Sequence, residues 1–564
     1  MTARDLLAEL EARRILVRAE GAHLRFRAPR GALTAEHRML LAEHKAEVLG
    51  VLRDAGSASR VSHPLSYNQL SVWLTHAIAP ESANYHIGFA MRVRSDLDVA
   101  ALRVVSQALV DRHAVLRTTY RIEHGEPIQD VHGHLPVDFA QIDVADDDPE
   151  QAWARVVAEH RRPFDLEDGP VFRVRLFTQA AREHMLLVTV HHIAADGWSL
   201  WMLLEELRTL YRAGRGGVAS TLPMPAAEYL DFVRRQRDLL ESADAERHWS
   251  HWHAQCATAP AALELPTDRP RPAIPGDHGA SCVRTMAPEL AERLRALARS
   301  EGTTPYTVLL AAFHVLLHRY TGQDEIVVGS PSFGRSHSGF DKVLGHFVNM
   351  LPLRGDLSGN PTFRSFLNQM RTVVLDGLTH QDYPFALIVE RLGRRRDPSR
   401  FPLFQVAFQF QQAQQSVDES ALLDGDLVLE PMALPQQEGQ FDLTLEVTEL
   451  GGALHATLKY RTDLFDASTI ARMQDHLGTL LAGIVEDPDQ RVVHLGLLTP
   501  AEREQIVGEW NRTEAPYAVD TCLHELIEAQ AERTPGRVAV EFEGQTLTYG
   551  ELDGRANQLA HVLV

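Results

Sequence analysis

Two adjacent histidines stand where the periodicity of the chain changes from strand to helix, in the run His191-His192-Ile193-Ala194-Ala195-Asp196-Gly197. Residues 184–190 are rich in branched aliphatic side chains, which predicts a buried strand. Residues 200–211 place apolar side chains at helical spacing, and Ser199 is expected to cap that helix. The sequence therefore predicts a strand, a tight turn and a helix, with both histidines at the end of the strand.

The same run carries residue types suited to proton transfer. Successive side chains of a strand point to opposite faces, so His191 and His192 are expected to do different jobs. Histidine titrates near neutral pH and can accept a proton from an attacking amine. Gly197 permits unusual backbone angles and close approach of a ligand, and the first N–H groups of the helix can stabilise an oxyanion. The alternative is two core histidines with an aspartate in a turn, and we favour the functional interpretation.

Six further segments accompany this run in a fixed order, at residues 66–73, 112–120, 228–232, 344–354, 380–385 and 396–406. Together they resemble the motifs of condensation domains of nonribosomal peptide synthetases, which belong to the chloramphenicol acetyltransferase-like superfamily. Three positions depart from that pattern. Ser71 replaces the usual arginine, Ala114 a frequent glutamate and Phe401 a common asparagine, which puts any role of that arginine in doubt.

The resemblance implies an α/β (α+β) fold of two chloramphenicol acetyltransferase-like subdomains, residues 61–250 and 251–498, in a V-shaped pseudo-dimer around a tunnel. It implies amide formation between an upstream acyl or peptidyl thioester and a downstream aminoacyl thioester. Both substrates would arrive on the phosphopantetheine arms of carrier proteins, with no covalently bound cofactor and no metal.

The resemblance also assigns roles to residues. His192 is expected to act as a base or to position the amine, and His191 to be structural. Asp196 is expected to hold the loop through an ion pair with Arg335, because a buried aspartate without a partner is costly. Gly197 is expected to let the thioester approach. Three residues are expected on the tunnel wall: Trp198, Ser199 and Asn349.

Residues 1–54 are predicted to form a separate helix–hairpin–helix unit, with a helix over 5–14, a two-stranded hairpin over 15–27, and a helix over 35–53 capped by Thr34. This unit resembles the docking domains of tubulysin-type assembly lines, whose hairpin receives an acidic C-terminal peptide of the upstream protein. Basic residues concentrate on the hairpin, and Arg18, Arg25 and Arg27 are the expected docking residues. The alternative is that these arginines form a solvated face. Residues 55–60 are predicted to be a flexible linker.

The C-terminal part of the chain has a different character. After a predicted linker at 499–520, residues 521–564 resemble the opening of an adenylation domain. No glycine-rich phosphate loop follows, so this segment is not expected to adenylate a substrate alone. The downstream carrier protein and the adenylation domain are the expected further partners.

Composition limits the function classes. The formal net charge is −20 over 564 residues, which argues against a general nucleic-acid binder. Cys256, Cys282 and Cys522 show neither metal-ligand spacing nor a disulfide framework, which suits a reducing compartment. Neither a signal peptide nor a membrane span is expected, and the predicted location is the cytoplasm.

Two other functions stay open. The body of the chain could be a non-catalytic module that recruits carrier proteins, although the intact His192, Asp196 and Gly197 argue against this. It could also be an acyltransferase or hydrolase acting on a carrier-bound thioester, because the same histidine can activate water or an alcohol. The absence of a Gly-x-Ser-x-Gly motif argues against an ordinary serine hydrolase. The sequence leaves open whether the donor is peptidyl, polyketide or lipid.

Overall fold

The computed structural model describes most of the chain. The residues it leaves undescribed are 1–5, 8, 11–14, 21–22, 28–33, 59, 216–221, 261, 275, 277, 338, 394–396, 413–427 and 517–518. The chain divides into two compact units, Met1–Leu497 and Leu498–Val564. The first unit has the predicted mixed α/β architecture.

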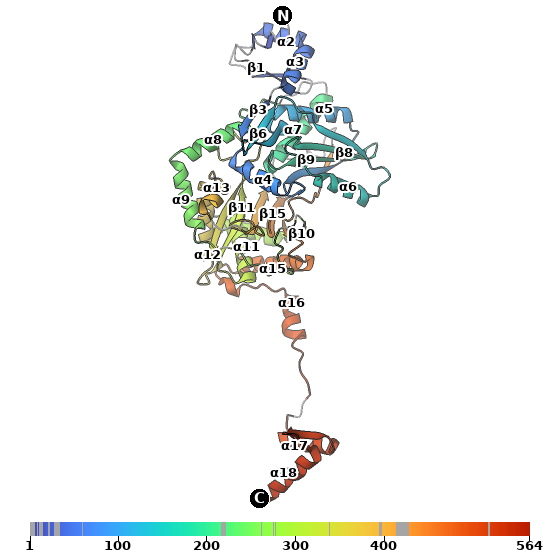
Figure 1. The fold of residues 1–564 in the computed structure, drawn as a ribbon, viewed down its shortest axis with the longest axis vertical. Helices are drawn as coiled ribbons and strands as arrows, with labels where there is room; N and C mark the ends of the chain where they lie inside the picture. The colour runs from blue at the N-terminus through green and yellow to red at the C-terminus, as the bar shows by residue number, and fades with distance from the viewer. Residues whose placement is uncertain are drawn as a thin grey trace. The chain divides into compact units, whose positions relative to one another are not determined.

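The first half of the large unit is built on a five-stranded sheet in the order β14-β4-β9-β8-β7. Figure 1 labels β8 and β9 of this sheet. Its strands are β4 (His86–Val93), β7 (Asp138–Asp143), β8 (Phe172–Ala180), β9 (Glu183–His191) and β14 (Leu429–Met432). A three-stranded sheet, β3-β6-β5, accompanies it, with β3 (Arg60–Pro64), β5 (Thr118–Glu123) and β6 (Glu126–His132). The helices are α4 (Tyr67–Ile78), α5 (Val99–Arg112), η1 (Ala114–Arg117), α6 (Pro149–Arg161) and α7 (Gly197–Arg215).

Strand β9 lies inside this sheet and is buried along almost its whole length. It pairs antiparallel with β4 on one side and with β8 on the other. Leu186 and Val188 face the main apolar core of this half, whereas Met185 and Leu187 face a smaller core that includes residues of α6. A strand covered on both faces is apolar throughout, which explains the uninterrupted aliphatic run before the histidines.

The second half is built on a six-stranded sheet in the order β10-β16-β15-β13-β11-β12. Its strands are β10 (Gly279–Thr285), β11 (Glu325–Ser332), β12 (Asn349–Asp356), β13 (Val406–Gln412), β15 (Leu443–Leu450) and β16 (Ala453–Arg461). Its helices are α10 (Pro288–Ser300), α11 (Pro305–Thr321), α12 (Phe363–Thr379), α13 (Phe385–Leu392), α15 (Ala467–Glu486) and η2 (Val492–His494). Helix α11 is apolar and buried over most of its surface, so it forms the centre of this core.

The two halves exchange segments. Helices α8 (Tyr229–Glu241) and α9 (Asp244–Cys256) connect them, and Trp252 of α9 packs in the core of the second half. In return, Phe347 packs in the core of the first half, and β14 pairs antiparallel with β4. The predicted boundary at residue 250 therefore falls inside α9, and the subdomain limits stay predictions.

The N-terminal hairpin is present as β1 (Leu16–Glu20) and β2 (His23–Arg27), with Arg18 opposite Arg25 and Leu16 opposite Arg27. The side chains of Arg18, Arg25 and Arg27 lie outside the described ones, as does much of the predicted helix over residues 5–14.

The helical part of this N-terminal segment differs from the prediction. Thr34 caps α2 (Ala35–Glu43) as expected, because its hydroxyl accepts a bond from the N–H of His37 at 3.2 Å. The prediction of one continuous helix over residues 35–53 is wrong. The helix is interrupted at His44, and a second helix, α3 (Lys45–Ala58), follows. Part of the predicted flexible linker, residues 55–58, is therefore helical.

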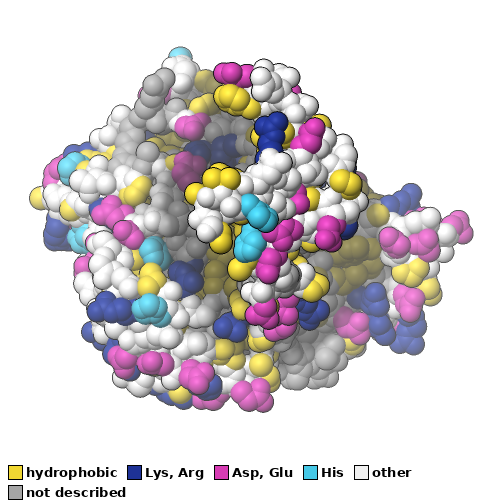
Figure 2. Space-filling model, turned by 90° about the horizontal axis from the view of Figure 1, so that it is seen from below, with side chains coloured by type: hydrophobic (Ala, Val, Ile, Leu, Met, Phe, Trp, Pro, Cys, Tyr) yellow, Lys and Arg dark blue, Asp and Glu magenta, His cyan; other side chains and the backbone are white. Residues whose placement is uncertain are grey.

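The C-terminal unit contains α16 (Pro500–Glu504), the π-helical turn η3 (Gln505–Glu509), α17 (Leu523–Arg533), β17 (Val538–Phe542), β18 (Gln545–Thr548) and α18 (Tyr549–Leu563). Strands β17 and β18 pair antiparallel. Among the helices that the structure describes, none is both long and apolar enough to cross a membrane. Figure 2 shows Asp and Glu side chains interspersed with Lys and Arg on one face of the molecule.

Candidate active site

The two histidines at the end of β9 enter different surroundings, as the strand geometry predicts. The ring of His191 is buried edge-on against His76, His86 and Phe164, with ring centroids 5.2 to 6.0 Å apart. Its Nδ1 accepts a bond from the N–H of Ile193 at 3.2 Å. Burial, reinforced by neighbouring histidines, holds the pKa of His191 well below its usual value, so this ring is neutral.

His192 is held by the turn that follows the strand. Its Nδ1–H donates to the carbonyl of Ala195 at 2.7 Å, which leaves the lone pair on Nε2. The ring packs edge-on against His346, at a centroid distance of 4.8 Å, and against Tyr85. Burial lowers the pKa of His192 and outweighs the opposing effects of Asp196 and the Ala195 carbonyl. His192 is therefore an uncharged base at neutral pH.

Asp196 is fully buried, and both of its carboxylate oxygens are occupied. Oδ1 accepts from the N–H of Ser199 at 2.9 Å and lies 2.8 Å from the Ser199 hydroxyl. Oδ2 accepts from Arg335 Nη1 at 2.6 Å and from the N–H of Phe347 at 3.1 Å. Burial alone raises the pKa of Asp196, but the charge of Arg335 and these hydrogen bonds bring it below its usual value.

Arg335 is present as the expected ion-pair partner. The exposed fraction of its side chain is 4%, and that of Asp196 is 1%. Its Nη2 donates to the hydroxyl of Ser199 and to the carbonyl of Val343, and its guanidinium lies 4.1 Å from the ring centre of Phe347. The pair therefore fixes the turn after His192 to the segment 333–347 of the second half.

The start of α7 differs from the prediction. The helix begins at Gly197, and Asp196 caps it through the N–H of Ser199, so Ser199 is not the cap. Ser199 is also not on the tunnel wall, because it is fully buried and its hydroxyl belongs to the Asp196 network. Gly197 does not adopt the left-handed backbone region, and a Cβ built there meets no atom within 4 Å. The space beside Gly197 is thus open.

A cavity of about 2540 Å³ lies between the two halves, and His192, Gly197, Trp198, His346 and Asn349 are among its lining residues. Trp198 is anchored by a bond from its Nε1 to the carbonyl of Asp341 at 3.0 Å. The side-chain amide of Asn349 is used by backbone groups of residues 381–385, so it also holds a loop. No group of three or more metal-ligating side chains is found among the described residues.

The sequence reasoning missed His346 and Tyr229. His346 Nδ1 lies 3.1 Å from Nδ1 of His192, and burial, the largest cause, lowers its pKa to about 3. The hydroxyl of Tyr229 donates to the carbonyl of His346 at 2.7 Å and lies 2.8 Å from the Ser66 hydroxyl. Both residues fall in segments that the sequence singled out, so a search for polar side chains in those segments would have found them.

Two α/β halves that share a cavity, with a histidine from a buried strand end on its wall, define a fold of the chloramphenicol acetyltransferase-like class. The family model of the condensation domain matches residues 60–507, and that of the TubC N-terminal docking domain matches residues 4–54. The chain therefore belongs to the condensation domains of nonribosomal peptide synthetases, which are amide-forming acyltransferases, and carries a TubC-type docking domain before it.

Curated relatives agree with this family. One of the linear gramicidin synthase proteins of Brevibacillus parabrevis is 39% identical over 506 residues, covering 89% of this chain and 6% of that protein. Chondramide synthase of Chondromyces crocatus is 36% identical over 508 residues, covering 89% of this chain and 13% of that protein. The chain thus spans a small fraction of the length of these relatives.

Solved structures share the fold. A four-domain nonribosomal peptide synthetase bound to AMP and glycine matches with a TM-score of 0.77 and 25% identity, covering 90% of this chain and 39% of that one. The X-domain from teicoplanin biosynthesis matches with a TM-score of 0.70 and 28% identity, covering 77% of this chain and 97% of that one.

The Asp196–Arg335 pair should behave as a coupled, stabilising unit. Removing one partner leaves the other buried without a counter-charge, so Asp196→Asn and Arg335→Met should each lower the free energy of unfolding by about 3–5 kcal/mol. The double variant should lose much less than the sum of the two. Urea unfolding of the four proteins measures this, and additive losses would contradict direct coupling.

Proposed function

We propose that this chain joins an upstream acyl or peptidyl group to the amine of a downstream aminoacyl group, both delivered as thioesters on the phosphopantetheine arms of carrier proteins. The observation that carries the proposal is the state of His192. Its Nδ1–H is bound to Ala195, so Nε2 holds a lone pair, and the residue lines a cavity large enough for two substrates.

In the proposed reaction the neutral amine attacks the thioester carbonyl and forms the new C–N bond. His192 Nε2 accepts the amine proton, or orients the amine before attack. The C–S bond breaks, and the amine proton passes to the departing thiolate, which leaves as the upstream carrier thiol. The open space beside Gly197 admits the thioester, and we assign stabilisation of the developing oxyanion to N–H groups at the start of α7 other than that of Ser199, which Asp196 binds. Because both substrates are tethered, their proximity supplies a large part of the rate enhancement.

The remaining site residues hold this arrangement. We assign Asp196 and Arg335 to fixing the turn, since both are buried and form an ion pair with each other. His191 keeps the end of β9 in place through its ring packing. Trp198 and Asn349 shape the cavity while anchoring segments of the second half.

The N-terminal unit is proposed to receive an acidic C-terminal peptide of the upstream protein. A two-stranded hairpin has free edges to which an extended peptide can add a strand. Arg18, Arg25 and Arg27 alternate along the hairpin strands, which gives the unit a basic character within an acidic chain. Residues 521–564 are proposed to begin an adenylation domain, which together with the downstream carrier supplies the acceptor.

Two alternatives can be weighed against the site. The first alternative is a recruiting module of the same fold, and a solved structure holds the teicoplanin X-domain in complex with OxyB. A hydrolase would use water in place of the amine at His192. The position of His192 on an open cavity, in a turn that the Asp196–Arg335 pair holds, supports catalysis, and a cavity with room for a second tethered substrate supports the amine.

Replacing the proposed base should stop amide formation without unfolding the protein. With an acyl-loaded upstream carrier and an aminoacyl-loaded downstream carrier, the wild-type protein should add the acyl mass to the downstream carrier, and His192→Ala should reduce this at least about a hundredfold. Intact mass spectrometry of both carriers is the measurement. Wild-type turnover by the variant would remove His192 from the mechanism, and free acid without transfer would favour a hydrolase.

Charge reversal on the hairpin should weaken capture of the upstream protein. Arg25→Glu/Arg27→Glu should raise the dissociation constant for the upstream carrier with its acidic C-terminal segment by about tenfold or more, and more steeply at low salt. Reaction with excess substrates loaded on carriers lacking that segment should be unchanged. Arg38→Glu, in α2, is the matched control, and equal binding by all three proteins would place the docking face elsewhere.

A further inference from the structure

The wall of the cavity that belongs to the second half is unusual, because its sheet presents polar side chains to the substrate space. Along β15 and β16, Leu445 and Leu458 face the apolar core. Thr444 and Lys459, which lie opposite each other in the register, face the cavity instead. The neighbouring strand β13 adds Gln409 to the same face. One face of this sheet therefore packs against the apolar core, and the other face lines the cavity with polar side chains.

Lys459 of this polar wall forms an ion pair with Glu446, which is not itself among the lining residues. Lys459 Nζ is 2.9 Å from Glu446 Oε2, and the exposed fractions of the two side chains are only 13% and 16%. Gln409 Nε2 donates to the same carboxylate oxygen. A partly buried ion pair is seldom more stabilising than apolar side chains of similar volume, so stability alone does not account for its position.

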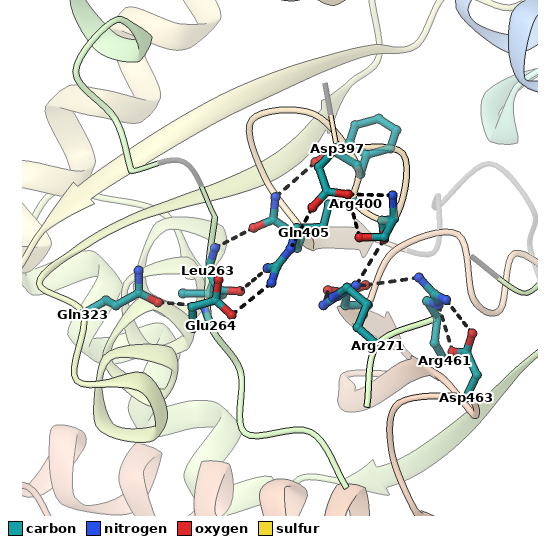
Figure 3. Close-up of polar contacts among 12 residues, drawn as sticks. Leu263, Glu264, Arg271, Gln323, Asp397, Arg400, Gln405, Arg461 and Asp463 are labelled. Atoms are coloured by element: carbon teal, nitrogen blue, oxygen red, sulfur yellow. Dashed lines mark hydrogen bonds and ion pairs between the residues drawn. The ribbon is translucent and has the colours of Figure 1, made fainter. Parts of the chain in front are cut away.

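Two arginines of the cavity lining, Arg461 and Arg400, are held by carboxylate partners (Figure 3). Arg461 donates to both carboxylate oxygens of Asp463, and Arg400 binds Glu264 and the carbonyl of Leu263. Lys459 makes a single ion pair in the described part of the chain, so two of its three N–H groups remain for a ligand.

Other residues of the cavity lining are apolar, among them Val374, Leu375 and Leu378 of α12 and Phe385 and Val389 of α13. The cavity therefore offers an occupant both hydrogen-bonding groups and apolar contact. Because Lys459 and Glu446 neutralise each other, the wall offers donors and acceptors without a net charge.

We infer that Lys459, Gln409 and Thr444, with Glu446 neutralising Lys459, form a subsite that selects acyl donors carrying an uncharged hydrogen-bonding group, an amide or a hydroxyl, over purely aliphatic donors. The inference rests on the proposed function and deepens it. The acceptor is a single aminoacyl group, so the part of the cavity that the acceptor and the two arms do not fill belongs to the donor chain. The pantetheine arm also contains amides, and the experiment has to separate it from the donor chain.

The test uses the whole chain with the same upstream carrier loaded with acetylglycylglycyl or with octanoyl, two acyl groups of equal chain length. The wild-type protein should transfer acetylglycylglycyl faster. In Lys459→Met/Glu446→Leu, which removes both charges together, the preference for acetylglycylglycyl over octanoyl should fall about tenfold. Arg295→Met/Glu449→Leu is the matched control and should keep the wild-type preference. This control removes the 2.7 Å ion pair between Arg295 and Glu449, which is about as buried as the Lys459–Glu446 pair and lies in the same half. Neither Arg295 nor Glu449 is among the residues that line the cavity.

The outcomes separate the possible failures. An octanoyl donor used as well as acetylglycylglycyl by the wild-type protein, an unchanged preference in the first double variant, or an equal loss in the control would each overturn the inference. Equal slowing of both donors would assign the wall to the pantetheine arm and also overturn it. Failure of the wild-type protein to transfer either donor would instead contradict the proposed function. Thr444→Val, which removes one hydroxyl at nearly constant volume, gives the same test if the double variant does not fold.

Discussion

The ion pair between Asp196 and Arg335 is the interaction on which the rest of the site depends. It joins the turn after β9 to a segment of the second half, and it is almost completely buried. A buried pair of this kind is tolerable only because the other carboxylate positions are filled, here by Ser199 and the N–H of Phe347. The same ion pair fixes the orientation of the His192 ring. The carbonyl that accepts its Nδ1–H belongs to Ala195, the residue immediately before Asp196.

Burial keeps His192 neutral although two other histidines lie beside it. His191 precedes His192 in the chain, His346 contacts its ring, and burial lowers the pKa of all three imidazoles. A group of imidazolium ions would repel one another and the buried Arg335, so the neutral forms are the stable ones. The same principle acts at the polar wall, where Lys459 and Glu446 can be partly buried because they neutralise each other.

Much of this arrangement can be predicted from the sequence, because it depends on local patterns. The aliphatic run before His191 predicts β9, and the cost of an unpaired buried aspartate predicts a partner for Asp196. The predicted cap of α7, Ser199, is wrong because Asp196 caps the helix. Serine and aspartate are both favourable N-cap residues, and only the backbone conformation decides which of the two begins the helix.

Other features could not be predicted because tertiary packing decides them. The four-residue strand β14 has too little periodicity to reveal that it completes the sheet of the first half. Helix α9 shows no sequence signal that it packs in the second core, and the contact between His346 and His192 joins positions 154 residues apart. The polar face of β15 and β16 has the alternation of a solvent-exposed strand, and only the fold shows that it faces a cavity.

The most direct test of this account is the protonation state of His192 at pH 6.5, where an unperturbed histidine is about half charged. Nitrogen-15 NMR of the whole chain with labelled histidine reports it, with His192→Gln used to assign the signal. The account predicts a mainly neutral ring with its proton on Nδ1 and the lone pair on Nε2. A half-charged ring, or a proton on Nε2, would contradict it, because the base would then not be available where the structure places it.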